Sequence, residues 1–580
     1  MQTARYGLAT LLLGFALAIS AEPAEDFTAL LDEVWEWQLA ENPMFASQLG
    51  DRRYNDRWSD QSVTAIERRQ QQTREFLQRV YAIDRSALGD ADQLNYELFR
   101  RQLQDNVDSF AFNAYLIPFN QRGGVQNLDN NTNSLSFVTV KDYEDWLTRL
   151  GKVDVVIEQS IDRAEKGRKS GMMSPTILMR RIPDQISVQL VEDPETSPFY
   201  KVFAEMPNAI PIDEQQRLRA LARETITETV LPAYRKLDKY FSATYLPASR
   251  ESIGLSELPN GSEWYEYLAR RFTTTQMSPN DIHRLGLNEV RRIRDEMQKI
   301  IDGLDFGGSF DDFLVFLRTD SQFYFDNPDD LYQAYLATSK RIDPELVKLF
   351  GKLPRMPYGV KPIPDSIAPD TTTAYYSRPA ADGSRAGTYW VNLYKPEVRP
   401  RYEIEVLSVH EAMPGHHLQI SLQQELPDMP NFRRFMGFTA FVEGWGLYSE
   451  SLGYDLGLYK DEYSQFGQLT YEMWRAVRLV VDTGIHYKGW TRQQAIDFFK
   501  DNAAKTELDI INEIDRYIGM PGQALAYKIG QLKMKSIRDN AERTLGDDFD
   551  VRAFHDELLG GGALPLDILE QRMDAWLEDQ

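Results

Sequence analysis

Half of the histidines of this chain lie in one short segment, residues 409–419, with the sequence VHEAMPGHHLQ. Three of the six fall there, His410, His416 and His417, and Glu411 directly follows the first of them. Histidine is a common zinc ligand, and a carboxylate beside such a ligand can take a proton from an attacking water. The segment therefore predicts a divalent-metal site with Glu411 as the general base.

The spacing of these histidines requires a break in the helix that carries them. His416 follows His410 by six residues and His417 by seven, whereas residues about four apart share one face of a straight helix. Pro414 lacks a backbone N–H and Gly415 accepts unusual backbone angles, so we expect the chain to bulge between the histidines. We expect the bulge to return His416 to the metal, with His417 as the alternative ligand.

A third ligand is expected in residues 441–450, with the sequence FVEGWGLYSE. Catalytic zinc usually has three protein ligands and one open position. Glu443 lies among aromatic and apolar residues, where a carboxylate is costly unless a cation pairs with it. Glu450, on the same helical face, would brace a ligand histidine or would lie exposed.

Residues 475–486 carry a polar stripe on an otherwise apolar helix. Its members are spaced by three, four and four residues and share one face: Arg475, Arg478, Asp482 and His486. In a functional interpretation, His486 donates to the oxyanion and the arginines hold a substrate carboxylate. Asp482 would contact the metal ligands and orient them. In the alternative interpretation, the four residues form a buried network that only orients helices.

The motifs resemble those of a known peptidase clan. The run Glu443–Glu450 resembles the segment with the third zinc ligand in the aminopeptidase branch of the gluzincins. Residues 410–419 resemble the angiotensin-converting-enzyme-like motif with two residues inserted. The Pro-Gly-His-His combination is most similar to the bacterial domain-of-unknown-function 885 family, which is assigned to the same clan. This resemblance extends over most of the mature chain, including residues 475–486, 521–530 and 554–556.

The resemblance implies a large helical metallopeptidase fold with Zn²⁺ as its cofactor. It also implies that a downstream tyrosine, Tyr517 or Tyr527, donates a hydrogen bond to the oxyanion. Two features depart from better-known gluzincins: the histidine spacing is longer, and no Gly-x-Met-Glu-Asn run is present. The second departure leaves open how a substrate amine would be held.

Most of the chain has a helical pattern, so the fold class is expected to be mainly α. Residues 214–242 repeat apolar side chains at steps of three and four. Ser278 followed by Pro279 is typical of a helix start, and a helix is expected to run from there to about residue 303. Capping boxes at Ser309 and Thr491 predict two further helix starts.

Residues 353–400 break the helical pattern with repeated prolines and turn residues. Within them, residues 387–394 are rich in β-forming types, and Tyr375-Tyr376 would pair with them as a hairpin. A small β-sheet near residues 370–395 is therefore expected beside the active-site helix, the alternative being a loop without strands. Tyr389 and Asn392 are expected to bind substrate, because the edge of their strand would pair with an extended peptide.

The N-terminus resembles an export signal. Arg5 precedes an apolar run from Leu8 to Ile19 and then small residues, so residues 1–21 are expected to form a cleaved signal peptide. Residues 22–250 would form an N-terminal helical half and residues 251–580 a catalytic half. The chain has no cysteine, which argues against a lipid anchor and predicts a periplasmic or extracellular protein without disulfides.

The net charge of −23 and the isoelectric point near 4.9 exclude a typical nucleic-acid-binding protein and disfavour anionic lipid surfaces. We therefore expect an exported zinc peptidase whose partner is a short or unfolded peptide, without stable membrane insertion after signal removal. Two alternatives are a metal-dependent amidase acting on a non-peptide substrate such as a cell-wall fragment, and a non-catalytic binding protein with a vestigial site. The sequence does not indicate side-chain preference, endo- or exo-cleavage, or oligomeric state.

Overall fold

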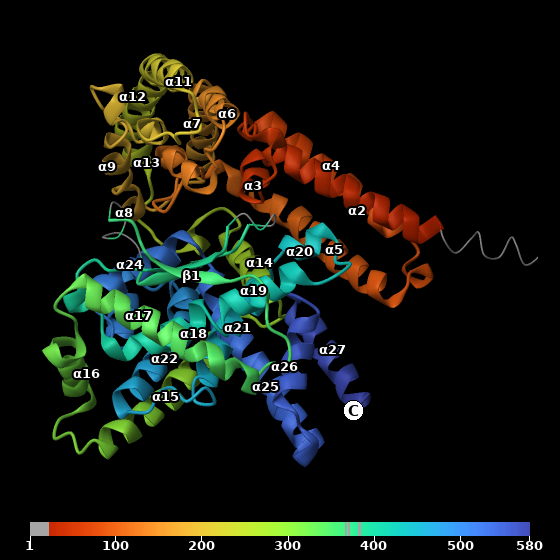
Figure 1. Ribbon diagram of the computed structural model, residues 1–580, viewed down its shortest axis with the longest axis vertical. Coiled ribbons are helices and arrows are strands. Elements are labelled where there is room, and N and C mark those ends of the chain that lie inside the picture. The colour runs from red at the N-terminus through yellow and green to blue at the C-terminus, as the bar shows by residue number, and fades with distance from the viewer. Residues whose placement is uncertain (1–21, 366–367, 369–371, 381–382, 384) are drawn as a thin grey trace, which may run out of the picture. The chain divides into compact units, whose positions relative to one another are not determined.

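The computed structural model describes residues 22–580 except 366–367, 369–371, 381–382 and 384 (Figure 1). The expected signal peptide lies outside the described residues. The chain divides into two compact units, and the main boundary lies between Ser249 and Arg250. The N-terminal unit contains residues 22–173, 179–249 and 429–433, and the C-terminal unit contains the rest. In the described part of the chain, no helix has the length and hydropathy needed to cross a membrane.

The N-terminal unit is built from helices around an aromatic core. Trp146, Tyr143, Phe199 and Tyr234 are almost fully buried there, and their rings contact one another or their neighbours. The helices are α2 (Glu22–Glu41), α3 (Pro43–Gln48), α4 (Val63–Ala82), α5 (Asp90–Ser109), α6 (Val140–Leu150), α7 (Val153–Ser170), α9 (Ile182–Ser187), α10 (Lys201–Ala204), α11 (Ile212–Thr225), α12 (Leu231–Tyr240) and α13 (Leu246–Ala248). Two short helices have residues in both units: α8 (Thr176–Met179) and α20 (Asn431–Phe435).

The C-terminal unit is organised around α22 (Glu462–Lys488), whose residues from Phe466 to His486 are all buried. It packs against α15 (Pro279–Gly303), α18 (Ile404–Glu411) and α21 (Thr439–Leu452). The other helices are α14 (Gly261–Thr273), α16 (Phe310–Thr319), α17 (Pro328–Ile342), α19 (His416–Glu425), α23 (Arg492–Lys500), α24 (Glu507–Gly519), α25 (Ala526–Leu545), α26 (Val551–Gly560) and α27 (Leu566–Glu578).

The mainly helical fold class is confirmed, and so are the helix starts that the capping patterns predicted. Ser278, Ser309 and Thr491 are the N-cap residues of α15, α16 and α23, and the hydroxyl of each accepts a hydrogen bond from the backbone N–H three residues later. Residues 214–242 remain helical throughout, because a π-helical turn at Ile226–Val230 joins α11 to α12.

A three-stranded sheet lies beside α17 and α18 (Figure 1). Its order is β1 (Tyr358–Pro362), β3 (Gly387–Val391), β2 (Ala374–Ser377), with β1 parallel and β2 antiparallel to β3. The expected hairpin is confirmed, since Tyr376 pairs with Tyr389 in register. The sequence did not predict β1, and its pairing makes β3 the central strand. The expectation that β3 offers a free edge to substrate is therefore wrong.

Candidate metal centre

The predicted break in the metal-binding helix is present. Helix α18 ends at Glu411 and α19 begins at His416, with non-helical backbone angles at Ala412 (φ −103°, ψ −105°) and Gly415 (φ −73°, ψ −127°). A Cβ on Gly415 would lie 1.9 Å from the carbonyl oxygen of His410, so only glycine fits this fold of the chain. The indole N–H of Trp445 on α21 donates to the carbonyl of Pro414 at 2.9 Å and holds the loop in place.

The break brings His410 and His416 together with Glu443 of α21. Nε2 of His416 lies 3.4 Å from Oε2 of Glu443, and Nε2 of His410 lies 3.9 Å from the same oxygen. One ligand atom from each residue lies within 4.8 Å of the other two. His410 and His416 are buried and Glu443 is partly buried. The ligand atoms of the three residues converge on one point.

This donor set fits a zinc ion. In a tetrahedral site with metal–ligand bonds near 2.0–2.2 Å, neighbouring ligand atoms are about 3.3 Å apart. The 3.4 Å separation already matches that value, the 3.9 Å separation needs a shift of a few tenths of an ångström, and the two histidine ligand atoms lie within 4.8 Å of each other. Two imidazoles and one carboxylate are also the ligand types that catalytic zinc accepts, with a fourth position left over.

The electrostatics of the triad favour positive charge at this point. Burial alone would raise the pKa of Glu443, but its hydrogen bonds with His410 and His416 hold that pKa well below the ordinary value. Burial would likewise lower the pKa of His410, yet the carboxylates of Glu443 and Glu450 raise it to about 9. At His410 the effect of the carboxylates on the pKa is therefore larger than the opposing effect of burial. A site with this excess of negative charge stabilises a divalent cation.

A second layer of residues orients His410. Its Nδ1 lies 2.8 Å from Oε1 of Glu450, which directs Nε2 toward the triad. The same Glu450 oxygen pairs with Nη2 of Arg475 at 3.4 Å. Gly446 leaves room for the ring, because a Cβ there would lie 2.8 Å from Cε1 of His410. The role of Gly446 was not predicted, although a glycine inside a helix often indicates close packing.

His417, the alternative ligand, lies outside the triad. Its Nε2 is 2.9 Å from the carbonyl oxygen of Met356, and its Nδ1 is 2.8 Å from the hydroxyl of Tyr376 on β2. Burial lowers the pKa of His417 to about 4, so the ring is neutral and both nitrogens are engaged. Its contacts tie α19 to the sheet.

Glu411 differs from every other carboxylate of the site. It is only 9% exposed, yet its carboxylate takes part in no hydrogen bond or ion pair with the described residues. Its position at the end of α18 is next to His410 in the chain. A buried carboxylate without a protein partner beside three convergent ligand atoms is what a general base for a bound water requires.

The comparison with family models confirms one part of the resemblance inferred from the sequence, the one to the domain-of-unknown-function 885 family. The model of a family described as "Bacterial protein of unknown function (DUF885)" matches residues 43–573. The chain belongs to this family. No protein with a curated description matches it.

Two solved structures share the fold of this DUF885 protein. One is described as a "putative lipoprotein" from Colwellia psychrerythraea; it is 27% identical, with a TM-score of 0.87 over 97% of this chain and 99% of that one. The other is described as a "putative lipoprotein of unknown function" from Shewanella oneidensis; it is 18% identical, with a TM-score of 0.73 over 95% of this chain and 99% of that one. The second shows likeness of fold alone.

The polar stripe on α22 has a different arrangement from the functional one expected for it. Nδ1 of His486 accepts a hydrogen bond from the backbone N–H of Leu255, and Nε2 lies 3.0 Å from the carbonyl oxygen of Tyr517. Neither nitrogen is left for an oxyanion. Asp482 accepts from the hydroxyl of Tyr265 and the N–H of Gly522 and does not contact the metal ligands. Of the two residues expected to support the ligands, Glu450 contacts His410 and Asp482 does not.

The expected tyrosine donors also differ in their surroundings. The hydroxyl of Tyr517 accepts from Trp474 at 3.0 Å and from Nε of Arg478 at 2.9 Å, so it belongs to a buried network. Tyr527 makes one longer contact, 3.3 Å from Nη2 of Arg516, and its role as a donor stays a prediction.

The two sheet residues expected to bind substrate are both buried. The Asn392 side chain instead holds backbone: its amide donates to Ala368 and Thr372, and its oxygen accepts from Tyr394. Tyr389 is fully buried in β3. Burial raises its pKa well above the ordinary value, and the charge of Glu411 adds to this shift. Tyr389 therefore packs behind the proposed base.

Proposed function

We propose that this protein is a zinc-dependent peptidase that hydrolyses peptide bonds by activating a water molecule. The observation that carries the proposal is the unpartnered carboxylate of Glu411 beside the convergent ligand atoms of His410, His416 and Glu443. A purely structural site would satisfy Glu411 within the protein, and a binding site without catalysis needs no base there.

His410, His416 and Glu443 would hold the zinc ion. When bound, zinc supplies a Lewis acid that makes water more acidic and polarises the scissile carbonyl. Glu411 would take the proton of the attacking water and return it to the leaving amine, so the carboxylate is regenerated at the end of each turnover. Glu450 would keep His410 oriented through its hydrogen bond to Nδ1, and Arg475 would hold Glu450 in place.

The outer edge of β2 offers a place for an extended peptide. Among the described strands, β2 pairs only with β3, and it packs against α18. Tyr376 of β2 has its ring centroid 6.5 Å from that of His416, so the strand passes close to the triad. A peptide bound to this edge would receive backbone hydrogen bonds that do not depend on its side chains.

We propose that the arginines of α22 bind a negatively charged group of the substrate. Nε of Arg475 and Nη1 of Arg478 are buried and have no hydrogen-bond partner among the described residues. Arg475 already pairs with Glu450 and Arg478 with Glu513, so a substrate carboxylate would share these guanidinium groups with the acids beside them. Export to the periplasm or beyond is also part of the proposal and rests on the N-terminal signal pattern alone.

A peptide-library digest read by mass spectrometry tests the proposal, with the metal content measured on the same protein. We expect close to one zinc per chain and cleavage of short peptides. The Glu411→Gln variant should keep its zinc and lose hydrolysis, whereas Glu397→Gln, which changes an exposed carboxylate, should behave as the unmodified protein. Full hydrolysis by the Glu411→Gln variant would exclude the mechanism, and cleavage of cell-wall fragments but not peptides would exclude the substrate class.

A further inference from the structure

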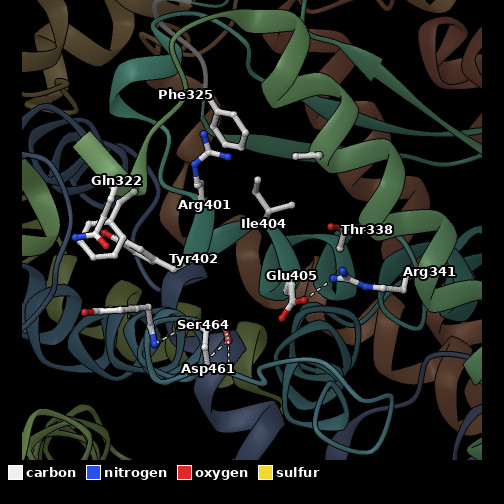
Figure 2. A pocket seen from close by; sticks show the side chains of 13 residues that line it. Gln322, Phe325, Thr338, Arg341, Arg401, Tyr402, Ile404, Glu405, Asp461 and Ser464 are labelled. Carbon is white, nitrogen blue, oxygen red and sulfur yellow. Dashed lines mark hydrogen bonds and ion pairs between the residues drawn. The ribbon is translucent and has the colours of Figure 1, made fainter. Parts of the chain in front are cut away.

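A cavity of about 380 Å³ lies against the first turn of α18, at the end of the helix opposite to His410 and Glu411 (Figure 2). Its walls come from the segment after α16, from α17 and from the start of α22. No residue of the metal triad lines it. Small-molecule sites in proteins commonly measure roughly 300–1,000 Å³, so the cavity has the size of a site for a small ligand.

Both carboxylates of the cavity wall are already satisfied by the protein. Glu405 pairs with Arg341 across the cavity and also accepts the N–H of Tyr459 at 2.7 Å. Asp461 is the N-cap of α22, and its carboxylate accepts three hydrogen bonds, from the N–H groups of Tyr463 and Ser464 and from the hydroxyl of Ser464. Arg341 balances the charge of Glu405, and the oxygens of Asp461 are occupied by hydrogen bonds although the group keeps its charge.

The guanidinium of Arg401, unlike these carboxylates, keeps N–H groups that are not bonded to the described residues. It lies 3.7 Å from the centroid of the Phe325 ring, and its Nε donates to the carbonyl of Tyr324 at 2.9 Å. These two contacts fix the plane of the group. Arg401 is an exposed residue at the rim of the cavity. Its two terminal nitrogens donate to no residue in the described part of the chain, and no carboxylate there forms an ion pair with it, so they are open to solvent or to a ligand. Figure 2 shows this guanidinium on one side of the cavity and the Arg341–Glu405 pair on the other.

Apolar and aromatic side chains supply the rest of the wall. Phe323, Tyr402 and Ile404 are at least nine-tenths buried and reach the cavity. The rings of Phe323 and Tyr463 are 4.9 Å apart and form an aromatic side of the cavity. A fixed guanidinium beside such a surface matches a ligand with one anionic group and one apolar group.

We propose that this cavity binds a small organic carboxylate that carries an aromatic or branched apolar group. The carboxylate would take the two terminal nitrogens of Arg401 in a bidentate pair, and the apolar group would lie against Phe323, Tyr402 and Ile404. The cavity is separate from the metal triad, and this inference does not depend on peptidase activity.

Calorimetric titration of the full mature chain with N-acetyl-L-phenylalanine tests the inference. A chelator is present, so the probe carboxylate cannot bind a metal at the triad. We expect saturable binding in or below the millimolar range, one probe per chain. Loss of a charge-assisted pair weakens binding by about tenfold or more, so N-acetyl-L-phenylalaninamide and the Arg401→Gln variant should each bind at least that much more weakly.

Two variants locate the probe. Arg294→Gln removes another arginine that stacks on a ring, 4.1 Å from the centroid of Phe310, but it does not line the cavity and should bind normally. Ala334→Phe fills the cavity from α17 and should abolish binding even if Arg401→Gln folds poorly. Undetectable binding of N-acetyl-L-phenylalanine, equal binding of its amide, or normal binding by Ala334→Phe would each overturn the proposal.

Discussion

The metal triad and the polar face of α22 lie in the same unit and are made of the same residue types, but their side chains are in different states. On α22, both nitrogens of His486 are bonded to backbone groups, and Asp482 accepts two hydrogen bonds. At the triad, the ligand atoms of His410 and His416 converge on one carboxylate oxygen, and Glu411 has no partner among the described residues.

The difference separates polar groups that serve folding from those that serve chemistry. Burying a polar group is costly unless it is bonded, so a folded protein normally satisfies such groups internally. His486 and His417 follow that rule, because both ring nitrogens of each are bonded to groups of the protein. Glu411 has no such partner among the described residues, and its carboxylate oxygens keep some contact with solvent, so a water, an ion or a substrate can be the partner.

The largest expected effect comes from substituting two neighbouring histidines one at a time, because the comparison assigns them opposite roles. His416→Gln should lose the metal and with it several kcal/mol of transition-state stabilisation, which corresponds to roughly a thousandfold slower hydrolysis. His417→Gln should keep the metal, because His417 bonds only to Met356, Tyr376 and Ser421.

Metal content and rate are measured on both variants, together with their urea unfolding. The His417→Gln variant is expected to lose about 1–3 kcal/mol of stability, since a buried carbonyl and hydroxyl lose their partner. Loss of metal from His417→Gln but not from His416→Gln would reverse the ligand assignment.

Sequence patterns predicted the triad more completely than its surroundings, for a physical reason. His410, Glu411 and His416 follow from ligand chemistry and from the geometry of one helix break, which are both local. Glu443 lies on another helix and was found from its apolar neighbours and from the resemblance of its motif. The partner of Arg475 is Glu450, on another helix, and spacing along α22 gives no information about what faces it. The same holds for β1, whose pairing with β3 is set by the fold and reverses the role expected of that strand.

A smaller effect is expected from the residues that orient His410. Glu450→Gln removes the carboxylate that accepts from Nδ1, and second-layer changes of this kind typically lower metal affinity by roughly 10–100-fold. Arg475→Gln should act in the same direction but more weakly, because Arg475 reaches the metal only through Glu450.

Chelator competition measures zinc affinity in both single variants and in the double variant. If Arg475 acts through Glu450, the double variant should bind zinc no more weakly than Glu450→Gln alone. Additive losses would show that Arg475 affects zinc binding by a route other than Glu450.

The smallest effect is expected on the α22 side, in how stability depends on pH. Burial lowers the folded-state pKa of His486 to about 3, whereas an unfolded histidine titrates near 6.5. The unfolded chain therefore binds a proton at this position below about pH 6.5 and the folded chain does not, so this residue makes the protein less stable as the pH falls. In the His486→Gln variant that contribution is absent.

The destabilisation caused by His486→Gln should accordingly shrink by about 1 kcal/mol between pH 7.5 and pH 5.5, as measured by urea unfolding at both values. Zinc content should be unchanged, because His486 contacts only backbone through its ring nitrogens. A destabilisation that grew on acidification would mean that His486 is charged in the folded state. Its two backbone bonds would then need reassigning, because a charged ring cannot accept from the N–H of Leu255, and the contrast between His486, bonded at both nitrogens, and Glu411 would fail.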